Sequence, residues 1–197
     1  MHEYVSARPR AQLVDVLLAA QIALYALRVA GAAYLGVGGG GGLGIMLARG
    51  ERMSQPFLLL LFIATAIAFL FWLDRAARNL PSLGGTDGCK AIAAEHVVGV
   101  FFAPVVNLFA APYVVYHVWL ASDPTPPRRG WLVLGWWPPL VAAWLTLAWP
   151  LVSGALLLGS ALALVAIVRD VQRRQDEQFL DEERRRAVPA PTADALR

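Results

Sequence analysis

The chain has 197 residues, of which 58% are hydrophobic and 16% are charged, and its formal net charge is +3. Soluble proteins average ~45–50% hydrophobic and ~25% charged residues, so this composition excludes an ordinary soluble domain. The weak and dispersed positive charge argues against nucleic-acid binding, and the single cysteine, Cys89, excludes an internal disulfide or a zinc cluster.

Long uncharged stretches predict an all-α integral membrane protein. A membrane-spanning helix needs ~20 apolar residues, and the chain offers this several times; residues 131–168, for example, contain no charged side chain. We expect residues 1–10 to form a cytoplasmic N-terminus and residues 11–171 to form the membrane domain. Its predicted spans lie at about 11–35, 56–74, 131–149 and 151–169.

The breaks between the predicted spans coincide with glycine and proline. The glycine-rich run after residue 35 disfavours a helix, so we expect a loop up to Gln55, with Pro56 as the first residue of the second helix. Trp149 and Pro150 are expected to form the turn between the last two spans. Residues 172–197 are expected to form a cytoplasmic helix and a disordered tail. The four-residue spacing of Asp170 and Arg174 suits an ion pair on the solvated helix that follows the last span.

A fifth apolar segment, residues 96–122, leaves two topologies to compare. If it crosses the membrane, the basic residues near the spans divide five to seven between the two sides. If it enters and leaves on one side, only Arg49 and Arg52 lie outside, and ten basic residues lie inside. Cytoplasmic loops carry an excess of Lys and Arg. We therefore expect four spans, both termini in the cytoplasm, and a re-entrant or interfacial helix at 96–122.

Two prolines shape the expectation for segment 96–122. Pro104 and Pro112 each remove a backbone donor and predict a kink or a break in the helix. On a helix, small and polar residues of this segment share one face, which we expect to pack on the bundle. These residues are His96, Gly99, Ala103, Asn107, Ala110, His117 and Ala121. The segment is either a kinked structural helix or a broken helix that lines a polar cavity.

The second span ends in polar residues, which we interpret as its cytoplasmic boundary. Arg75, Arg78 and Asn79 share one helical face, and Asp74 precedes Arg78 by four residues, a favourable spacing for an ion pair. The arginines suit contacts with lipid phosphates. Alternatively, Arg75 or Asn79 forms a polar lock by bonding the broken backbone of segment 96–122.

Two further features concern the other spans. Arg28 lies roughly 10 Å inside the outer end of the first span by helix rise, and an arginine at that depth is a functional candidate unless it extends its side chain outwards. Ala155, Gly159 and Ala163 form a small-residue stripe, which predicts close helix packing in the last span.

Enzyme signatures are missing from the sequence. There is no H-E-x-x-H, no G-x-S-x-G and no P-loop, and the three histidines have no Cys or carboxylate at ligand spacing. We therefore expect no catalytic residue, no metal site and no cofactor. The candidate polar cluster, with a structural or a ligand-binding role, consists of Arg28, Arg75, Arg78, Asn79, His96 and Asn107.

The chain carries a combination of motifs that resembles a known family. The motifs are Trp72-x-x-Arg75-x-x-x-Asn79, Pro104-x-x-Asn107-Leu108, Pro112-Tyr113, Trp119-x-x-Ser122 and Gln172-x-x-Gln175. From about Phe57 to Phe179 they resemble the bacterial membrane family called domain of unknown function 4328. Asp74 stands where members of that family usually have an aromatic residue. The resemblance implies a multi-span protein of the bacterial inner membrane and implies no activity.

We accordingly predict a non-enzymatic membrane scaffold or partner-binding protein that uses its cytoplasmic tail helix as the contact. The alternative is a small transporter or channel subunit that uses the broken helix at 96–122, because discontinuous helices often mark substrate sites. A membrane enzyme is the third class. The expected partners are the lipid bilayer and a protein, or a second copy bound through small-residue helix faces.

Overall fold

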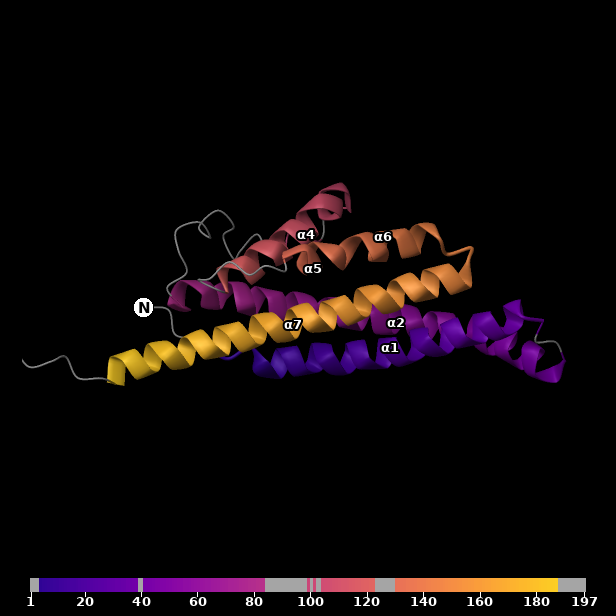
Figure 1. Cartoon of the computed structure of the whole chain (residues 1–197), viewed down its shortest axis with the longest axis horizontal. Helices are drawn as coiled ribbons and strands as arrows, with labels where there is room; N and C mark the ends of the chain where they lie inside the picture. The colour runs from indigo at the N-terminus through magenta and orange to yellow at the C-terminus, as the bar shows by residue number, and fades with distance from the viewer. Residues whose placement is uncertain are drawn as a thin grey trace, which may run out of the picture.

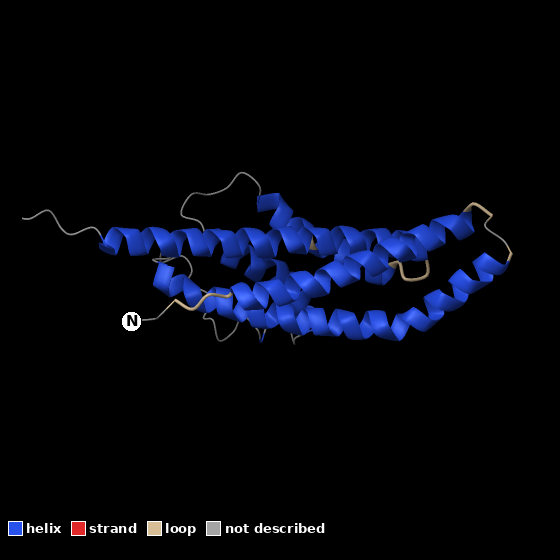
Figure 2. Cartoon of the chain, turned by 90° about the horizontal axis from the view of Figure 1, so that it is seen from below, coloured by secondary structure: helices blue, strands red, loops and turns tan. Residues whose placement is uncertain are grey.

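The computed structural model describes residues 4–38, 41–83, 99, 101, 104–122 and 130–187, and every regular element among them is helical (Figure 2). In chain order these elements are α1 (Arg8–Gly36), α2 (Gly42–Asn79), the short 3₁₀ helix η1 (Leu80–Leu83), α4 (Pro104–Ala121), α5 (Gly130–Gly135), α6 (Trp137–Leu145) and α7 (Pro150–Ala187).

Three of the described helices are long and apolar enough to cross a membrane. Their candidate segments are Arg8–Gly36, Met53–Leu83 and Pro150–Arg185. This confirms an all-helical fold with candidate membrane spans in three of the predicted places. Two shorter apolar helical stretches, Phe109–Ala121 and Val133–Leu145, accompany them. The predicted span at 131–149 is divided at Trp136 between α5 and α6.

Helix α1 runs antiparallel to both α2 and α7, and the three long helices form the body of the bundle (Figure 1). Buried Gln21 of α1 donates a hydrogen bond to Thr65 Oγ1 of α2 at 2.8 Å, and Arg169 Nε of α7 lies 2.9 Å from Asp15 Oδ2 of α1. One end of the bundle, called here the terminal end, contains Tyr4, the end of α2 and the second half of α7. The opposite end, the hairpin end, contains the α1–α2 turn and the start of α7.

The α1–α2 turn shows where glycine is needed. Gly38 and Gly41 have φ values of +85° and +88°, a conformation that favours glycine. The predicted loop up to Gln55 is wrong, because α2 begins at Gly42 and contains Pro56 in its interior. The residues between Leu43 and Gln55 are mostly good helix formers, and the proline removes only one backbone donor from a helix of 38 residues.

The remaining helices return to the terminal end and leave it again. Leu83, at the end of η1, and Ser122, after α4, both lie at the terminal end, since Ser122 is bonded to Gln175 beside the end of α2. From there α5 and α6 run toward the hairpin end. Ser160 of α7 donates to the Trp136 carbonyl at 2.8 Å, and the ring of Trp144 lies 5.6 Å from that of Phe62.

The core lies between α1, α2, α4 and α7, and it corrects two packing predictions. Helix α4 buries the larger side chains Val114, Val115, Val118 and Trp119, together with Ala111, while Ala110, His117 and Ala121 are only half-buried. Large apolar side chains remove more surface from lipid contact and gain more dispersion contacts. The prediction that the small-residue stripe of α7 packs in the core is also wrong, because Ala155 and Gly159 are exposed.

Candidate functional site

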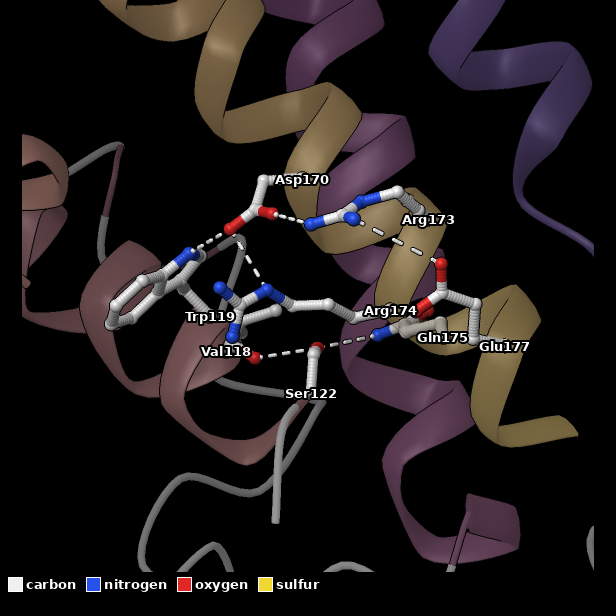
Figure 3. Close-up of polar contacts among 8 residues, drawn as sticks. All are labelled: Val118, Trp119, Ser122, Asp170, Arg173, Arg174, Gln175 and Glu177. Atoms are coloured by element: carbon white, nitrogen blue, oxygen red, sulfur yellow. Dashed lines mark hydrogen bonds and ion pairs between the residues drawn. The ribbon is translucent and has the colours of Figure 1, made fainter. Parts of the chain in front are cut away.

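Asp170, on α7, is the centre of a polar cluster that joins α7 to α4 (Figure 3). Its Oδ2 accepts a hydrogen bond from Trp119 Nε1 at 2.8 Å and forms an ion pair with Arg174 Nε, also at 2.8 Å. Its Oδ1 accepts from Arg173 Nη2 at 2.9 Å. One carboxylate therefore accepts two hydrogen bonds and forms a further ion pair, which is an arrangement that stabilises an ionised carboxyl group.

Arg174 connects the same two helices by a second contact. Its guanidinium carbon lies 4.9 Å from the centre of a Trp119 ring, within cation–π distance, and its side chain is only 13% exposed. The four-residue spacing of Asp170 and Arg174 predicted a pair on a solvated helix. The pair forms, but it packs against α4 and is shielded from water.

Gln175 connects three helices by hydrogen bonds. It is fully buried, and its Nε2 donates to the Ala76 carbonyl of α2 and to Ser122 Oγ at the end of α4, both at 3.0 Å. Ser122 in turn donates to the Val118 carbonyl at 2.8 Å. Figure 3 shows the bonds that link Gln175, Ser122 and Val118 beside Asp170. A single amide thus fixes the position of α7 against both of its neighbours.

The N-terminal segment is held by the end of α2. The Val5 carbonyl accepts from Asn79 Nδ2 at 3.0 Å and from Arg75 Nε at 3.2 Å. The polar lock of Arg75 or Asn79 was predicted with segment 96–122 as its partner, whereas the bonds seen here go to the N-terminal segment. Asn79 is 1% exposed, so its amide needs this partner in place of water.

A last group of contacts joins the N-terminal segment to α7. Tyr4 donates its hydroxyl to Asp176 Oδ1 at 2.8 Å, and its ring stacks on Phe179 at 4.3 Å. Asp176 also accepts from Gln172 at 2.9 Å and from Arg8 at 3.0 Å. Burial, followed by the hydrogen bond to Asp176, raises the pKa of Tyr4 above its ordinary value. The phenol therefore stays protonated and remains a donor at neutral pH.

These contacts define the terminal cluster, which the sequence indicated only in part. Its members are Tyr4, Arg75, Asn79, Trp119, Ser122, Asp170, Gln172, Arg174, Gln175 and Asp176. Of the predicted candidates, Arg75 and Asn79 belong to it. Arg78 lies at the same end and forms the predicted ion pair with Asp74 at 3.0 Å.

Three further candidates were predicted: Arg28, His96 and Asn107. Arg28 lines a pocket near the hairpin end. His96 lies outside the described residues, and Asn107 lies in α4, but its side chain is outside the described part. Within that described part, no group of three His, Cys, Asp and Glu side chains could hold a metal ion.

Several members of the cluster were missed although the sequence contained a signal. Trp119, Ser122, Gln172 and Gln175 carried the family resemblance, yet nothing in their spacing showed that they meet. Tyr4 gave no signal, because its partners Asp176 and Phe179 are more than 170 residues away in the chain. Chemically, the cluster links four segments by hydrogen bonds and ion pairs, an arrangement suited to holding helices in register.

A comparison of two buried tryptophans measures the contribution of one of these hydrogen bonds to stability. Trp119 and Trp72 are 3% and 0% exposed, but only Trp119 donates to a carboxylate; Trp72 Nε1 has no hydrogen-bond partner among the described residues. Trp119→Phe should therefore lower the unfolding free energy by about 1.5 kcal/mol more than Trp72→Phe, since both lose similar volume. Thermal unfolding of the detergent-solubilised chain measures this difference; equal losses would contradict the assigned bond.

Comparison with known proteins assigns the chain to a family through its sequence alone. No curated protein and no solved structure matches it. The family model described as Domain of unknown function (DUF4328) matches residues 51–180, a range that contains the α2, α4 and α7 members of the terminal cluster and leaves out Tyr4 and Arg28. Because this range covers well over half of the 197 residues, the chain belongs to the DUF4328 family.

Proposed function

We propose that the chain crosses the cell membrane of a bacterium four times, with both termini in the cytoplasm. The support is geometric: the end of η1 and Ser122 lie at the same end of the bundle, which is what a segment that enters and leaves on one side requires. Residues 130–145, which contain α5 and α6, are roughly 24 Å long and lead back to the hairpin end. The positive-inside rule favours the same arrangement.

Cysteine labelling tests this topology. Cys89 is first replaced by serine, so that each variant has a single cysteine. Val37→Cys, in the exposed α1–α2 turn, should react with a membrane-impermeant maleimide in intact cells. Glu183→Cys, on the exposed last turns of α7, should react only after the membrane is opened. Ser122 is fully buried and is a poor labelling position. Labelling of both cysteines from the same side would contradict four spans.

We further propose a non-enzymatic scaffold that presents the last turns of α7 to a cytoplasmic protein partner. The supporting observation is that the terminal cluster fixes α7 as far as Phe179, after which the helix extends to Ala187 beyond the rest of the bundle (Figure 1). Leu180 is 50% exposed there, and its neighbours Asp181 and Arg184 pair with each other at 3.3 Å.

This projecting segment, residues 180–187, combines an exposed leucine with charges of both signs. Such a surface offers an apolar anchor surrounded by polar groups, which is the usual composition of a protein contact. A rigid helix also presents it without the ordering cost that a disordered tail would incur. The terminal cluster then serves this function indirectly, by fixing the direction in which α7 leaves the membrane.

Site-specific photo-cross-linking in cells tests the proposal. A photoreactive phenylalanine analogue at Leu180 should give one cross-linked protein species of defined mass. The same analogue at Leu162, which is equally exposed but lies within the apolar part of α7, is the control and should not give that species. Absence of any adduct at 180, together with solute flux in proteoliposomes, would favour a transporter and contradict the scaffold.

A further inference from the structure

A pocket of about 430 Å³ lies between the first turns of α1 and the middle of α7. Both basic and acidic side chains line it, among them Asp15 of α1 and Arg169 of α7, together with the amide of Gln172. We propose that this pocket binds the headgroup of an aminophospholipid, with the phosphate on Arg169 and the ammonium group between Asp15 and Gln172. The site does not depend on the scaffold function.

Two acceptor atoms in the wall of the pocket lack a donor. Asp15 Oδ1 and Gln172 Oε1 are buried, and neither accepts a hydrogen bond from the part of the chain that the structure describes. A buried acceptor without a donor costs free energy, which a bound donor recovers. The Asp15 side chain as a whole is 24% exposed, so rotation of its carboxylate about one bond brings Oδ1 to the pocket surface.

The two acceptors border the same part of the pocket. Asp15 Oδ2 lies 2.9 Å from Arg169 Nε, and Gln172 follows Arg169 by three residues, which is about 5 Å along the helix. A small group with several N–H donors therefore fits between them. A primary ammonium group has three such donors and a charge opposite to that of Asp15.

Arg169 supplies donors for an anion beside these acceptors. It uses Nε for Asp15, and its two terminal nitrogens bond to no acceptor among the described residues. The side chain is 68% exposed, so it has room to turn toward a ligand. A guanidinium donates two parallel hydrogen bonds to a phosphate. A cation and two acceptors thus lie side by side, which complements a ligand with one phosphate and one ammonium group.

The order of these groups along α7 matches their order in a phospholipid. No side chain is charged in residues 150–168 of α7 or in residues 16–27 of α1. The Asp15–Arg169 pair therefore marks the level at which both helices change from apolar to charged, where the lipid headgroups begin. The acyl chains, the phosphate and the ammonium group then meet, in turn, the apolar part of α7, Arg169 and Gln172.

The acyl chains have an apolar surface to follow from the pocket. The two ion pairs between α1 and α7 fix their antiparallel register, which places Ala19 of α1 near Ala166 of α7. Both alanines are exposed, and Leu162, one turn further along α7, is 53% exposed. At ~30 Å³ per water molecule, the pocket itself has room for about fourteen water-sized groups, which is enough for a phosphate and an ethanolamine.

The unpaired acceptors predict which headgroup the pocket prefers. Phosphatidylethanolamine and phosphatidylcholine have the same net charge and the same phosphate. The ammonium group of the first donates hydrogen bonds, whereas the quaternary ammonium group of the second has no N–H. Because Asp15 Oδ1 and Gln172 Oε1 need donors, the pocket should select phosphatidylethanolamine.

Native mass spectrometry of the detergent-solubilised full chain, with an equimolar mixture of the two lipids carrying identical acyl chains, tests the proposal. We expect the phosphatidylethanolamine adduct to be about tenfold more abundant, as a charge-assisted hydrogen bond predicts. Asp15→Asn and Gln172→Met should each bring the ratio of the two adducts close to one. Arg169→Gln should weaken both adducts and leave their ratio unchanged, because the two lipids share the phosphate.

Asp74→Asn is the matched control. Asp74 is 21% exposed and forms an ion pair with Arg78 at the same end of the bundle, but it does not line the pocket. This variant should keep both the amount of lipid and the wild-type ratio. Circular dichroism should show that every variant remains helical, so that a lost adduct is not a sign of unfolding.

Soluble phosphoethanolamine, which has the headgroup without acyl chains, distinguishes a lipid from a free zwitterion. It should displace the bound lipid only at much higher concentration; displacement at a concentration equal to that of the lipid would overturn a lipid site. Equal retention of the two lipids by the wild type would also overturn the proposal. So would a wild-type ratio in Asp15→Asn, or the same loss of preference in Asp74→Asn.

Discussion

Replacing Gln175 with alanine is expected to lower the free energy of unfolding by about 3 kcal/mol. The substitution removes two hydrogen bonds, one to the Ala76 carbonyl and one to Ser122 Oγ, at about 1 kcal/mol each, and it leaves a cavity in a fully buried place. The loss should appear in thermal unfolding of the detergent-solubilised chain. The effect is large because Gln175 is the one described side chain that bonds both α2 and α4 from α7.

Gln12 provides a control of the same residue type. It is exposed on α1, so Gln12→Ala should leave the unfolding temperature nearly unchanged. Gln175→Met keeps most of the volume and removes the hydrogen bonds, so its loss should lie between that of the alanine variant and that of the wild type. A Gln175→Ala protein as stable as Gln12→Ala would show that α7 does not depend on this amide.

Replacing Asp170 with alanine is the second large change, with an expected loss of about 2–3 kcal/mol. Arg174 would keep its charge at 13% exposure without its carboxylate, and Trp119 would lose its acceptor. Removing one partner of a shielded ion pair costs more than the pair contributes, because the remaining charge is not solvated. Urea unfolding in detergent, followed by the fluorescence of the chain's seven tryptophans, measures this loss.

Asp181→Ala is the matched control for this prediction. Asp181 pairs with Arg184 on the same helix, but both side chains are more than 60% exposed, so the loss should be about 0.5 kcal/mol or less. Adding Arg174→Leu to Asp170→Ala should recover part of the loss, since the stranded charge is then gone. A double variant less stable than Asp170→Ala alone would argue against a stranded charge as the cause.

Both predictions concern residues on α7 that the sequence placed in a solvated helix. The spacing of Asp170 and Arg174 is correct for a pair on one helix, and the pair is present. Spacing along one helix carries no information about what lies across from it. In the structure α4 covers this part of α7, and the pair becomes part of the contact between the two helices.

The family motifs in the terminal cluster likewise gave no information about which side chains contact one another. Trp119-x-x-Ser122 and Gln172-x-x-Gln175 were visible in the sequence as motifs. Whether the two motifs touch depends on how α4 and α7 pack against each other, which the sequence does not show. The partner of Asn79 could not be predicted at all, because Val5 carries no distinctive side chain and offers only a backbone carbonyl. Any carbonyl in the chain is chemically equivalent to it.

The sequence by itself determined the properties that depend on composition and local order. Uncharged stretches specify helices long enough for a membrane, glycines specify the α1–α2 turn, and four-residue spacing specifies the Asp74–Arg78 and Asp170–Arg174 pairs. Each of these follows from residues that are close in the chain.

Only the tertiary structure decided which polar groups meet. It brought Tyr4, Asn79, Ser122 and Gln175 to one end of the bundle, and it placed Arg28 beside the start of α7 at the other. The physical reason is that an apolar helix can pack through several faces with similar burial. The choice among them is made by the few polar side chains that must find a partner when water is absent.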